Sequence, residues 1–187
     1  KTMIHAEGLI SYLYQGGEPT LRGLTFFEKA VEYQRHYNKH GIRVNNALQT
    51  NGYLLDDAWC KFFKENQFLI GLSIDGTKQL HDMYRHDKNG NPTFDRIKSA
   101  ADLMDQYGVD YNILTVVTQN VAYHATEIYN YYKRQGWKYQ QYIACLDPLG
   151  EIRGKSSFAL KPEQYGRFLV ELFNLWYEDW KNGEHPY

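Results

Sequence analysis

Four short motifs carry side chains and backbone positions that could bind a small polar ligand. They are Gln15–Thr20 (QGGEPT), Gln49–Gly52 (QTNG), Ser73–Gly76 (SIDG) with His81–Arg85 (HDMYR), and Cys145–Pro148 (CLDP). Adjacent glycines let a ligand approach the main chain, whose carbonyls can then accept from an ammonium group. Ser73 offers a hydroxyl, and Arg85 offers a two-pronged donor that suits a carboxylate. Together these groups favour the zwitterionic end of an amino acid over a bare phosphate.

Each motif also has an ordinary structural explanation. The triplet Gly-Gly-Glu suits a tight strand-to-helix turn, with Glu18 as a favourable acid in the first helical turn. Asn-Gly and Asp-Gly pairs are typical of turns, so Asp75 would turn the chain and Arg85 would face solvent. A lone cysteine such as Cys145 is usually inert packing, and Asp-Pro is usually a turn. Taken alone, none of the four motifs is decisive.

Hydrophobic periodicity places all four motifs at the carboxyl ends of predicted strands. Short runs rich in β-branched and aromatic residues predict strands at Leu9–Tyr14, Arg43–Leu48, Phe68–Ile74, Tyr111–Val117 and Tyr139–Cys145. Apolar residues at helical spacing lie between them, and Gly41, Gly108 and Gly136 each end a helical stretch. Strands that recur about every thirty residues predict an α/β fold with a mostly parallel sheet. In a barrel or an open sheet alike, ligands then bind beyond the carboxyl ends of the strands.

Composition excludes several other classes of protein. The 187 residues carry 21 Lys and Arg against 22 Asp and Glu, without the basic excess that a general nucleic-acid binder needs. Only Cys60 and Cys145 are present, so a disulfide framework and a self-contained zinc or iron–sulfur site are excluded. No bilayer-spanning run, signal peptide or nucleotide-binding glycine motif occurs, and we expect a cytoplasmic setting. No metal-ligand spacing joins the histidines, which are His5, His36, His40, His81, His86, His124 and His185.

The order of the motifs resembles one family. YQGGEPTL, LQTNG, GLSIDG with HDMYR, TFDRI, ILTVVT, CLDPLGE and LWYEDW follow one another as in anaerobic sulfatase-maturating enzymes. These belong to the radical S-adenosylmethionine (AdoMet) superfamily, in the branch with a C-terminal SPASM domain. GGEP alone indicates the superfamily, whereas CLDPLGE with LWYEDW is much narrower. The resemblance covers nearly the whole chain.

The resemblance implies a partial, TIM-like (β/α)6 barrel and a role for each motif. Gly16 and Gly17 would bind the methionine ammonium of AdoMet through their backbone, and Glu18 would brace that loop. Ser73 and Arg85 would hold the carboxylate and ribose side of the cofactor. The remaining implied contacts are the backbone of Leu146 with the adenine, and Gln15 and Gln49 with the entering target peptide.

The chemistry that the resemblance implies belongs to the cofactors, and the protein positions it. A 4Fe-4S cluster would reduce AdoMet and release a 5′-deoxyadenosyl radical. That radical would take a hydrogen from the β-carbon of a Cys or Ser in an unfolded sulfatase, which ends as formylglycine. The electron donor would be a protein such as flavodoxin or ferredoxin.

The chain also departs from the family pattern. The C-x-x-x-C-x-x-C run for the radical-generating cluster is absent, and so are the C-terminal cysteines and the acid that deprotonates the substrate. We therefore expect residues 1–187 to be one partial barrel domain, without the cluster segment and SPASM domain, that does not turn over by itself. Nothing in Lys1–Gly8 can supply the first barrel strand, so Leu9–Tyr14 should be an open edge through which the fragment could self-associate.

Three other functions stay open at this point. The chain could belong to another radical AdoMet enzyme with a SPASM domain that modifies peptides. It could be a carbohydrate-active barrel, because 17 Tyr and 4 Trp accompany strand-end acids such as Glu18 and Asp75. It could also be a non-catalytic module that binds a cofactor or a partner.

Overall fold

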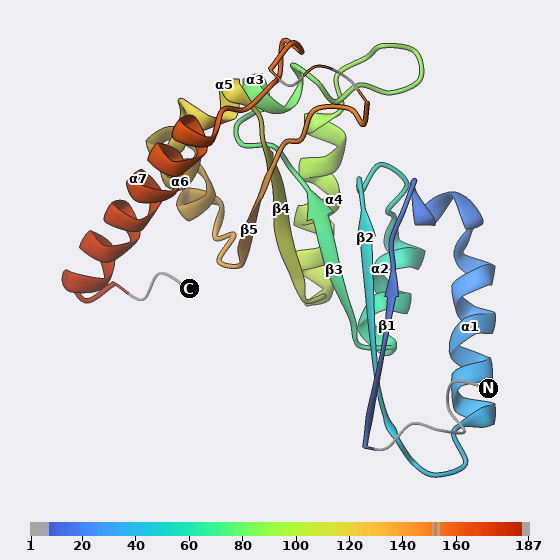
Figure 1. Ribbon diagram of the computed structural model, residues 1–187. Coiled ribbons are helices and arrows are strands. Elements are labelled where there is room, and N and C mark those ends of the chain that lie inside the picture. Colours follow the sequence, from blue (N-terminus) through green and yellow to red (C-terminus); the bar gives the residue numbers. More distant parts are fainter. Residues whose placement is uncertain (1–7, 151, 153, 185–187) are drawn as a thin grey trace. The chain divides into compact units, whose positions relative to one another are not determined.

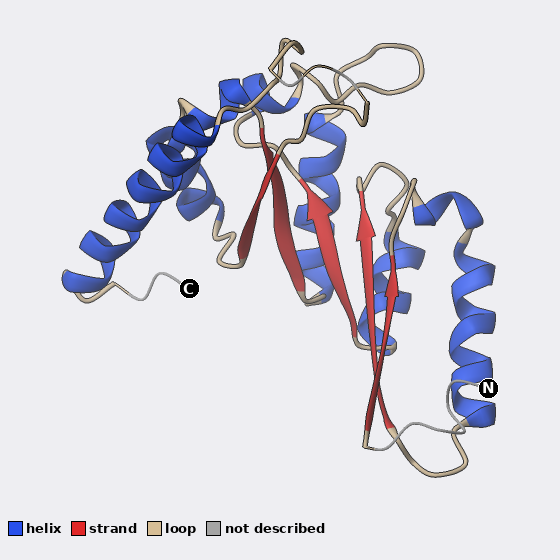
Figure 2. Ribbon diagram, viewed as in Figure 1, coloured by secondary structure: helices blue, strands red, loops and turns tan. Residues whose placement is uncertain are grey.

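The computed structural model describes residues 8–150, 152 and 154–184. Its strands form one sheet in the order β1-β2-β3-β4-β5, and the pairs β1–β2, β2–β3 and β4–β5 are parallel (Figure 2). The strands are β1 (Leu9–Tyr14), β2 (Arg43–Thr50), β3 (Phe68–Ser73), β4 (Tyr111–Val117) and β5 (Gln140–Ala144). The predicted α/β class is confirmed, and two of the five strands have the predicted bounds.

Helices alternate with the strands along the chain (Figure 1). They are the 3-10 helix η2 (Pro19–Arg22) and the α-helices α1 (Leu24–Tyr37), α2 (Asp57–Glu65), α3 (Lys78–His81), α4 (Phe94–Tyr107), α5 (Gln119–Ala122), α6 (Ala125–Gln135) and α7 (Pro162–Lys181). The described part of the chain contains no helix with the length and apolar character needed to cross a membrane.

The chain divides into two compact units, which are described separately below. The first comprises Lys1–Leu72 and Arg96–Tyr111, and the second comprises Ser73–Asp95 and Asn112–Tyr187. Strand β3 and helix α4 each continue from one unit into the other. The prediction of one domain over residues 1–187 stays a prediction.

Aromatic side chains fill the core of the first unit. Phe27 of α1 is fully buried and contacts the rings of Tyr14 on β1 and Trp59 on α2, at centroid distances of 5.1 and 5.4 Å. Phe63 of α2 lies 5.6 Å from the ring of Phe68, the first residue of β3. Burial of this aromatic surface fixes α1 and α2 on one face of the strands, which leaves the strand ends free for function.

The core of the second unit joins β4, α6 and α7. Tyr132 of α6 is fully buried, and its hydroxyl lies 2.7 Å from Oγ1 of Thr115 on β4. Phe168 of α7 is also fully buried and contacts the ring of Tyr142 on β5 at 5.2 Å. Helix α7 begins with Pro162 at a first-turn position, as the sequence predicts, because proline has no N–H to leave unpaired there.

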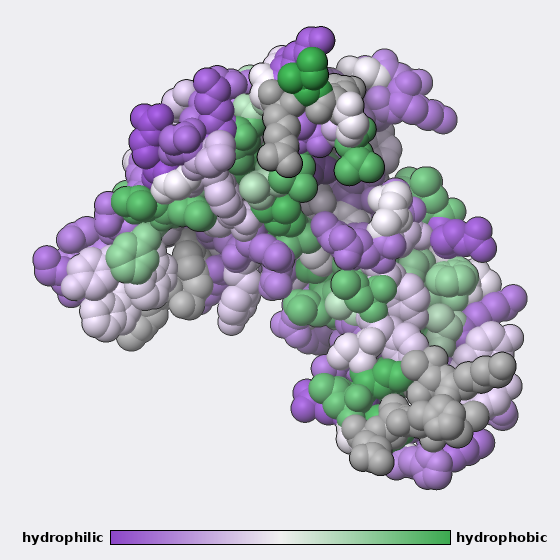
Figure 3. All heavy atoms as spheres, in the orientation of Figure 1, coloured by the Kyte–Doolittle hydropathy of each residue, from purple (hydrophilic) through white to green (hydrophobic). Residues whose placement is uncertain are grey.

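In the first unit, no helix among the described residues covers the opposite face of the strands (Figure 1). In the first unit, Leu13 of β1 and Leu69 of β3 are 64% and 43% exposed, whereas Ile70 and Leu72 of β3 are buried. This alternation is the period of a strand with one covered face. Figures 1 and 3 show the first unit from this side, with hydrophobic atoms at the surface over its strands.

Among the described residues, β1 lies at an edge of the sheet. Strand β1 is an edge strand, and the described residues contain no sixth strand that pairs with it. Lys1–Glu7, in which no strand was expected, lies outside the described residues. An edge strand presents unpaired N–H and C=O groups that can pair with further chain. Self-association through β1 stays a prediction.

Candidate functional site

The exit of β1 presents exposed backbone. Gly16 and Gly17 follow this strand with φ angles of 101° and 54°, which side chains rarely allow. Both glycines are exposed, and a Cβ atom added to either would meet no atom within 4 Å. The main chain at this turn is therefore open to close approach by a ligand.

Glu18 fixes this turn to the exit of β2. Its Oε1 accepts from the backbone N–H and the hydroxyl of Thr20, at 3.0 and 2.7 Å, and from the hydroxyl of Thr50 at 2.7 Å. Its Oε2 accepts from the N–H of Asn51 at 2.7 Å. Thr20 and Thr50 are each 2% exposed, so the carboxylate satisfies donors that water does not reach. One side chain thus joins two strand exits that lie more than thirty residues apart.

The two predicted substrate-binding glutamines lie beside this brace. Gln15 is exposed and comes directly after β1. Gln49 of β2 is half-buried and alternates with Leu48 and Thr50, which are buried on the helix-covered face. Strand periodicity therefore places Gln49 on the uncovered face. Contact of either glutamine with a substrate stays a prediction.

The exit of β3, in the second unit, contains a partly buried ion pair. Nε of Arg85 donates to Oδ2 of Asp75 at 2.5 Å, and its Nη2 donates to Oδ1 at 3.3 Å. Oδ1 of Asp75 also accepts from the N–H of Val116 on β4 at 2.8 Å. The side chains of Arg85 and Asp75 are 26% and 10% exposed. Arg85 is therefore held against the protein. It does not face solvent freely, as it would if Asp75 only turned the chain.

His81 supports both members of this ion pair. Its Nδ1 accepts from the N–H of Asp75 at 3.2 Å, and its Nε2 lies 3.2 Å from Oγ1 of Thr93. The Thr93 hydroxyl donates to the carbonyl of Arg85 at 3.1 Å, so this oxygen is left to accept from Nε2–H. Burial of the ring is the main cause that lowers the pKa of His81 to about 4. The ring is therefore neutral near pH 7, with its proton on Nε2.

The turn after Ser73 rests on a buried tyrosine. The hydroxyl of Tyr132 accepts from the N–H of Gly76 at 2.8 Å and donates to the carbonyl of Ile74 at 2.9 Å. Burial is the main cause that raises the pKa of Tyr132. Ser73 itself is 9% exposed, at the last position of β3. The second exit is thus anchored in the core of its unit.

Leu146, the last predicted cofactor contact, follows β5 in the second unit. Its side chain is 82% exposed, and its carbonyl lies 3.9 Å from the Sγ atom of Cys145. Burial is the main cause that raises the pKa of the Cys145 thiol, and it also raises the pKa of Cys60 to about 11. Neither cysteine has the lowered pKa of a reactive thiol.

The predicted residues therefore fall into two groups. The first unit contains Gln15, Gly16, Gly17, Glu18 and Gln49, and the second contains Ser73, Arg85 and Leu146. Within the first group, Glu18 bonds to the two residues that directly follow Gln49. A common ligand for the two groups stays a prediction.

The sequence did not indicate the partners of these residues. It singled out Asp75 only as a turn residue or a strand-end acid, and His81 only as part of a motif. Thr93 was expected only to cap the helix that starts at Phe94, and it lies eight residues beyond the carbonyl that its hydroxyl contacts. The one available signal was the presence of a histidine and an acid on either side of a short turn.

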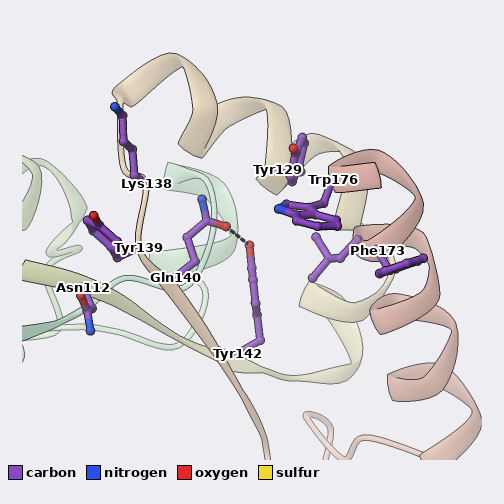
Figure 4. A pocket seen from close by; sticks show the side chains of 9 residues that line it. Asn112, Tyr129, Lys138, Tyr139, Gln140, Tyr142, Phe173 and Trp176 are labelled. Carbon is purple, nitrogen blue, oxygen red and sulfur yellow. Dashed lines mark hydrogen bonds between the residues drawn. The ribbon is translucent and has the colours of Figure 1, made fainter. Parts of the chain in front are cut away.

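A separate pocket of about 590 Å³ in the second unit contains none of the predicted residues. Figure 4 shows its aromatic and amide side chains, which come from the amino ends of β4 and β5 and from α6 and α7. The hydroxyl of Tyr142 donates to Oε1 of Gln140 there at 2.6 Å. Parallel sheets bind ligands at the carboxyl ends of their strands, so this pocket is not the candidate site. No group of three potential metal-ligating side chains lies together in the described ranges, and His5 and His185 fall outside them.

Comparisons with known proteins identify the family. Residues 1–127 match the model of the radical SAM superfamily. The cysteine-type anaerobic sulfatase-maturating enzymes of Clostridium perfringens (strain ATCC 13124) and Clostridium novyi are 49% and 42% identical, over 98% and 95% of this chain. The serine-type enzyme of Klebsiella aerogenes is 39% identical over 89% of the chain. The chain spans 50%, 48% and 41% of these three relatives.

Solved structures show similarity to the same group of proteins. Native anSMEcpe with bound AdoMet matches 99% of this chain with a TM-score of 0.96 and 48% identity, and 51% of that structure is covered. A second structure of that protein, with AdoMet and the Cp18Cys peptide, matches 98% of this chain with the same score. The fold is a partial TIM-like barrel, as the resemblance implied. Its family match covers more than half of the residues, and the chain therefore belongs to the radical SAM superfamily.

Proposed function

We propose that this chain is the AdoMet-binding core of an anaerobic sulfatase-maturating enzyme, which converts a Cys or Ser of a sulfatase to formylglycine. The observation that carries the proposal is the open Gly16–Gly17 backbone, which Glu18 fixes at a strand exit. The 49% identity to a cysteine-type enzyme, over 98% of the chain, supports the same assignment. A carbohydrate-active barrel has no comparable support.

The residues at the first exit fit the methionine end of AdoMet. The open space above Gly16 and Gly17 admits a ligand to the backbone, where carbonyl oxygens accept from an ammonium group. Glu18 does not bind the cofactor directly in this proposal, because both its oxygens already accept from the protein. It keeps the two glycines in their positive-φ conformation. Gln15 and Gln49 contact the target peptide.

The residues of the second exit fit a carboxylate. Arg85 uses Nε and Nη2 for Asp75, and among the described residues its Nη1 has no protein acceptor. A guanidinium fixed on one side donates to a ligand carboxylate from the other at little further entropic cost. Ser73 adds a hydroxyl, and the backbone of Leu146 is proposed for the adenine. When bound, AdoMet with a reduced 4Fe-4S cluster supplies a 5′-deoxyadenosyl radical that abstracts hydrogen.

Other components are supplied from outside this chain. The 4Fe-4S ligands lie in further parts of a longer protein, since Cys60 and Cys145 do not form a cluster site. The substrate is an unfolded sulfatase segment, in keeping with a relative whose structure holds a bound peptide. A flavodoxin or ferredoxin supplies electrons, and the reaction takes place in the cytoplasm.

The test uses the full-length protein that contains this chain, purified without oxygen and reconstituted with iron and sulfide. With AdoMet, a strong reductant and a sulfatase peptide, we expect 5′-deoxyadenosine and a formylglycine aldehyde by mass spectrometry. Peptides with Cys, Ser or Ala at the target position distinguish the two substrate types from background cleavage of AdoMet. Reconstituted protein that yields no 5′-deoxyadenosine would refute the proposal.

Arg85→Lys tests the carboxylate contact within the same protein. An ammonium cannot reproduce the guanidinium fork, and charge-assisted hydrogen bonds contribute roughly 1.5–3 kcal/mol, so the Kd for AdoMet should rise about tenfold or more. Calorimetry measures this change. Arg167→Lys, at an exposed position of α7, is the matched control. Equal affinities for the two variants would remove Arg85 from the site.

A further inference from the structure

The second exit contains a closed ring of interactions whose histidine has no assigned role. Going round the ring, the N–H of Asp75 donates to His81, Nε2 of His81 donates to Thr93, and Thr93 donates to the carbonyl of Arg85. The guanidinium of Arg85 returns to the carboxylate of Asp75. The His81 imidazole thus contacts the backbone of Asp75 directly and the carbonyl of Arg85 through Thr93, and the His81 carbonyl accepts from the N–H of Arg85 at 3.0 Å.

We propose that His81 is a positioning residue, which fixes the Arg85 guanidinium for the AdoMet carboxylate by holding the backbones of Asp75 and Arg85 at a set separation. The inference rests on the proposed function, because it concerns how Arg85 meets that cofactor. His81 itself does not touch AdoMet in this account.

This closed set of hydrogen bonds requires one protonation state of the His81 imidazole. Nδ1 must accept and Nε2 must donate, and a proton on Nδ1 would oppose the N–H of Asp75. His81 is 0% exposed, and the ring of Phe94 lies 5.5 Å from its own. The charged groups that act on it are Asp75, Arg85, Asp82 and Lys78, two of each sign. Burial therefore decides the protonation state of His81, and the imidazole is neutral.

Helix α3 and the turn before α4 are attached to each other by a second, independent contact. Oδ1 of Asp82 accepts from the N–H groups of Thr93 and Phe94, at 3.1 and 2.9 Å. Loss of the link between His81 and Thr93 therefore leaves these segments connected. What it removes is the contact between the imidazole and the Thr93 hydroxyl, which itself donates to the Arg85 carbonyl.

Two variants break the link between His81 and Thr93, and Thr93→Val also removes the hydrogen bond from Thr93 to the Arg85 carbonyl. His81→Asn keeps an acceptor for the N–H of Asp75 but is too short to reach Thr93. Thr93→Val has nearly the shape of threonine and lacks the hydroxyl. In the full-length, reconstituted protein we expect each variant to raise the Kd for AdoMet about fivefold, the equivalent of one net hydrogen bond. The rate of 5′-deoxyadenosine formation at saturating AdoMet should stay within about twofold, because the reacting groups are unchanged.

Further variants separate positioning from general stability. The double variant His81→Asn/Thr93→Val should show the same Kd as Thr93→Val alone, because Thr93→Val already removes the link that His81→Asn breaks. Thr93→Ser keeps the hydroxyl and should restore tight binding. His36→Gln changes an exposed histidine of α1 and should bind AdoMet like the unaltered protein. If His81→Asn does not fold, Thr93→Val and Thr93→Ser decide the question.

A spectroscopic measurement needs no turnover. With 15N-labelled histidine, the His81 ring should show a protonated Nε2 and an unprotonated Nδ1 from about pH 8 to about pH 5. His81→Asn assigns the signal by its disappearance. A proton on Nδ1 at neutral pH would overturn the inference.

The binding results distinguish the two proposals. If the unaltered protein cleaves AdoMet and Thr93→Val binds it with unchanged Kd, the role of His81 is refuted and the proposed function stands. If the unaltered protein neither binds nor cleaves AdoMet, the proposed function fails and this inference fails with it. Separate, additive effects of the two variants would also overturn the shared link.

Discussion

The two strand exits each depend on a carboxylate, but the two carboxylates are satisfied in different ways. Glu18 accepts only from neutral donors, namely backbone N–H groups and threonine hydroxyls. Asp75 accepts from the charged guanidinium of Arg85 and from one N–H. The first exit leaves backbone exposed, whereas the second places a cation at the surface of a buried network.

This difference would suit the two ends of the zwitterion that we propose as the ligand. An ammonium needs acceptors, and an exposed turn of glycines supplies carbonyls without a competing charge. A carboxylate needs a donor, and an arginine held by an acid supplies one with little loss of entropy on binding.

The largest effect should come from removal of the Glu18 carboxylate at the first exit. Glu18→Ala leaves the hydroxyls and N–H groups of Thr20, Thr50 and Asn51 without their acceptor, and two of these residues are 2% exposed. We expect the free energy of unfolding to fall by about 4 kcal/mol, because each buried unpaired donor costs roughly 1–3 kcal/mol. Urea denaturation measures this. Glu28→Ala, at an exposed position of α1, is the control, and its free energy of unfolding should stay within about 0.5 kcal/mol of that of the unaltered protein. An equal loss in both variants would contradict the role of Glu18.

Acid should weaken the second exit selectively. The pKa of His81 is lowered from 6.5 to about 4 by burial, so between these values the unfolded chain binds a proton that the folded chain excludes. His81 thus contributes stability that is complete above pH 6.5 and is lost as the pH falls toward 4. The loss should approach about 3 kcal/mol. Unfolding free energies of the unaltered protein and His81→Gln, compared at several pH values, should converge in acid, and parallel curves would exclude this role.

The anchor below the second exit should have a smaller effect. Tyr132→Phe removes the hydroxyl that accepts from Gly76 and leaves that buried N–H unpaired. We expect a loss of about 2 kcal/mol in the free energy of unfolding, measured by urea denaturation. Tyr33→Phe on exposed α1 is the control and should have almost no effect. A neutral Tyr132→Phe would mean that the turn does not depend on its anchor.

The smallest change in stability should separate backbone strain from ligand binding. Gly17→Ala and Gly136→Ala both place a side chain at positive φ, 54° and 72°, where neither Cβ meets an atom within 4 Å. Each should lose about 1 kcal/mol of unfolding free energy. In the full-length protein, only Gly17→Ala should weaken AdoMet binding in calorimetry. Equal affinities would show that the first exit is only a turn.

The sequence by itself determined the elements and the class of fold. Alternating and helical patterns placed β1 and β4 at their observed bounds, because burial of one face imposes a period that residues near in sequence reveal. Gly41, Gly108 and Gly136 have positive φ angles as expected, since the steric cost of that conformation is local. The motifs that resemble the family are also continuous in sequence.

Only the tertiary structure decided which groups meet at the strand exits. Glu18 pairs with residues 32 and 33 positions away, and Asp75 with an arginine ten positions away and an N–H 41 positions away. Arg85 was predicted as a free clamp or a solvated side chain, and neither alternative included its acid. Side-chain partners depend on how distant segments approach, and a polar residue carries no periodic pattern that reveals its partner. The neutral state of His81 has the same origin, because burial in the folded chain sets its pKa.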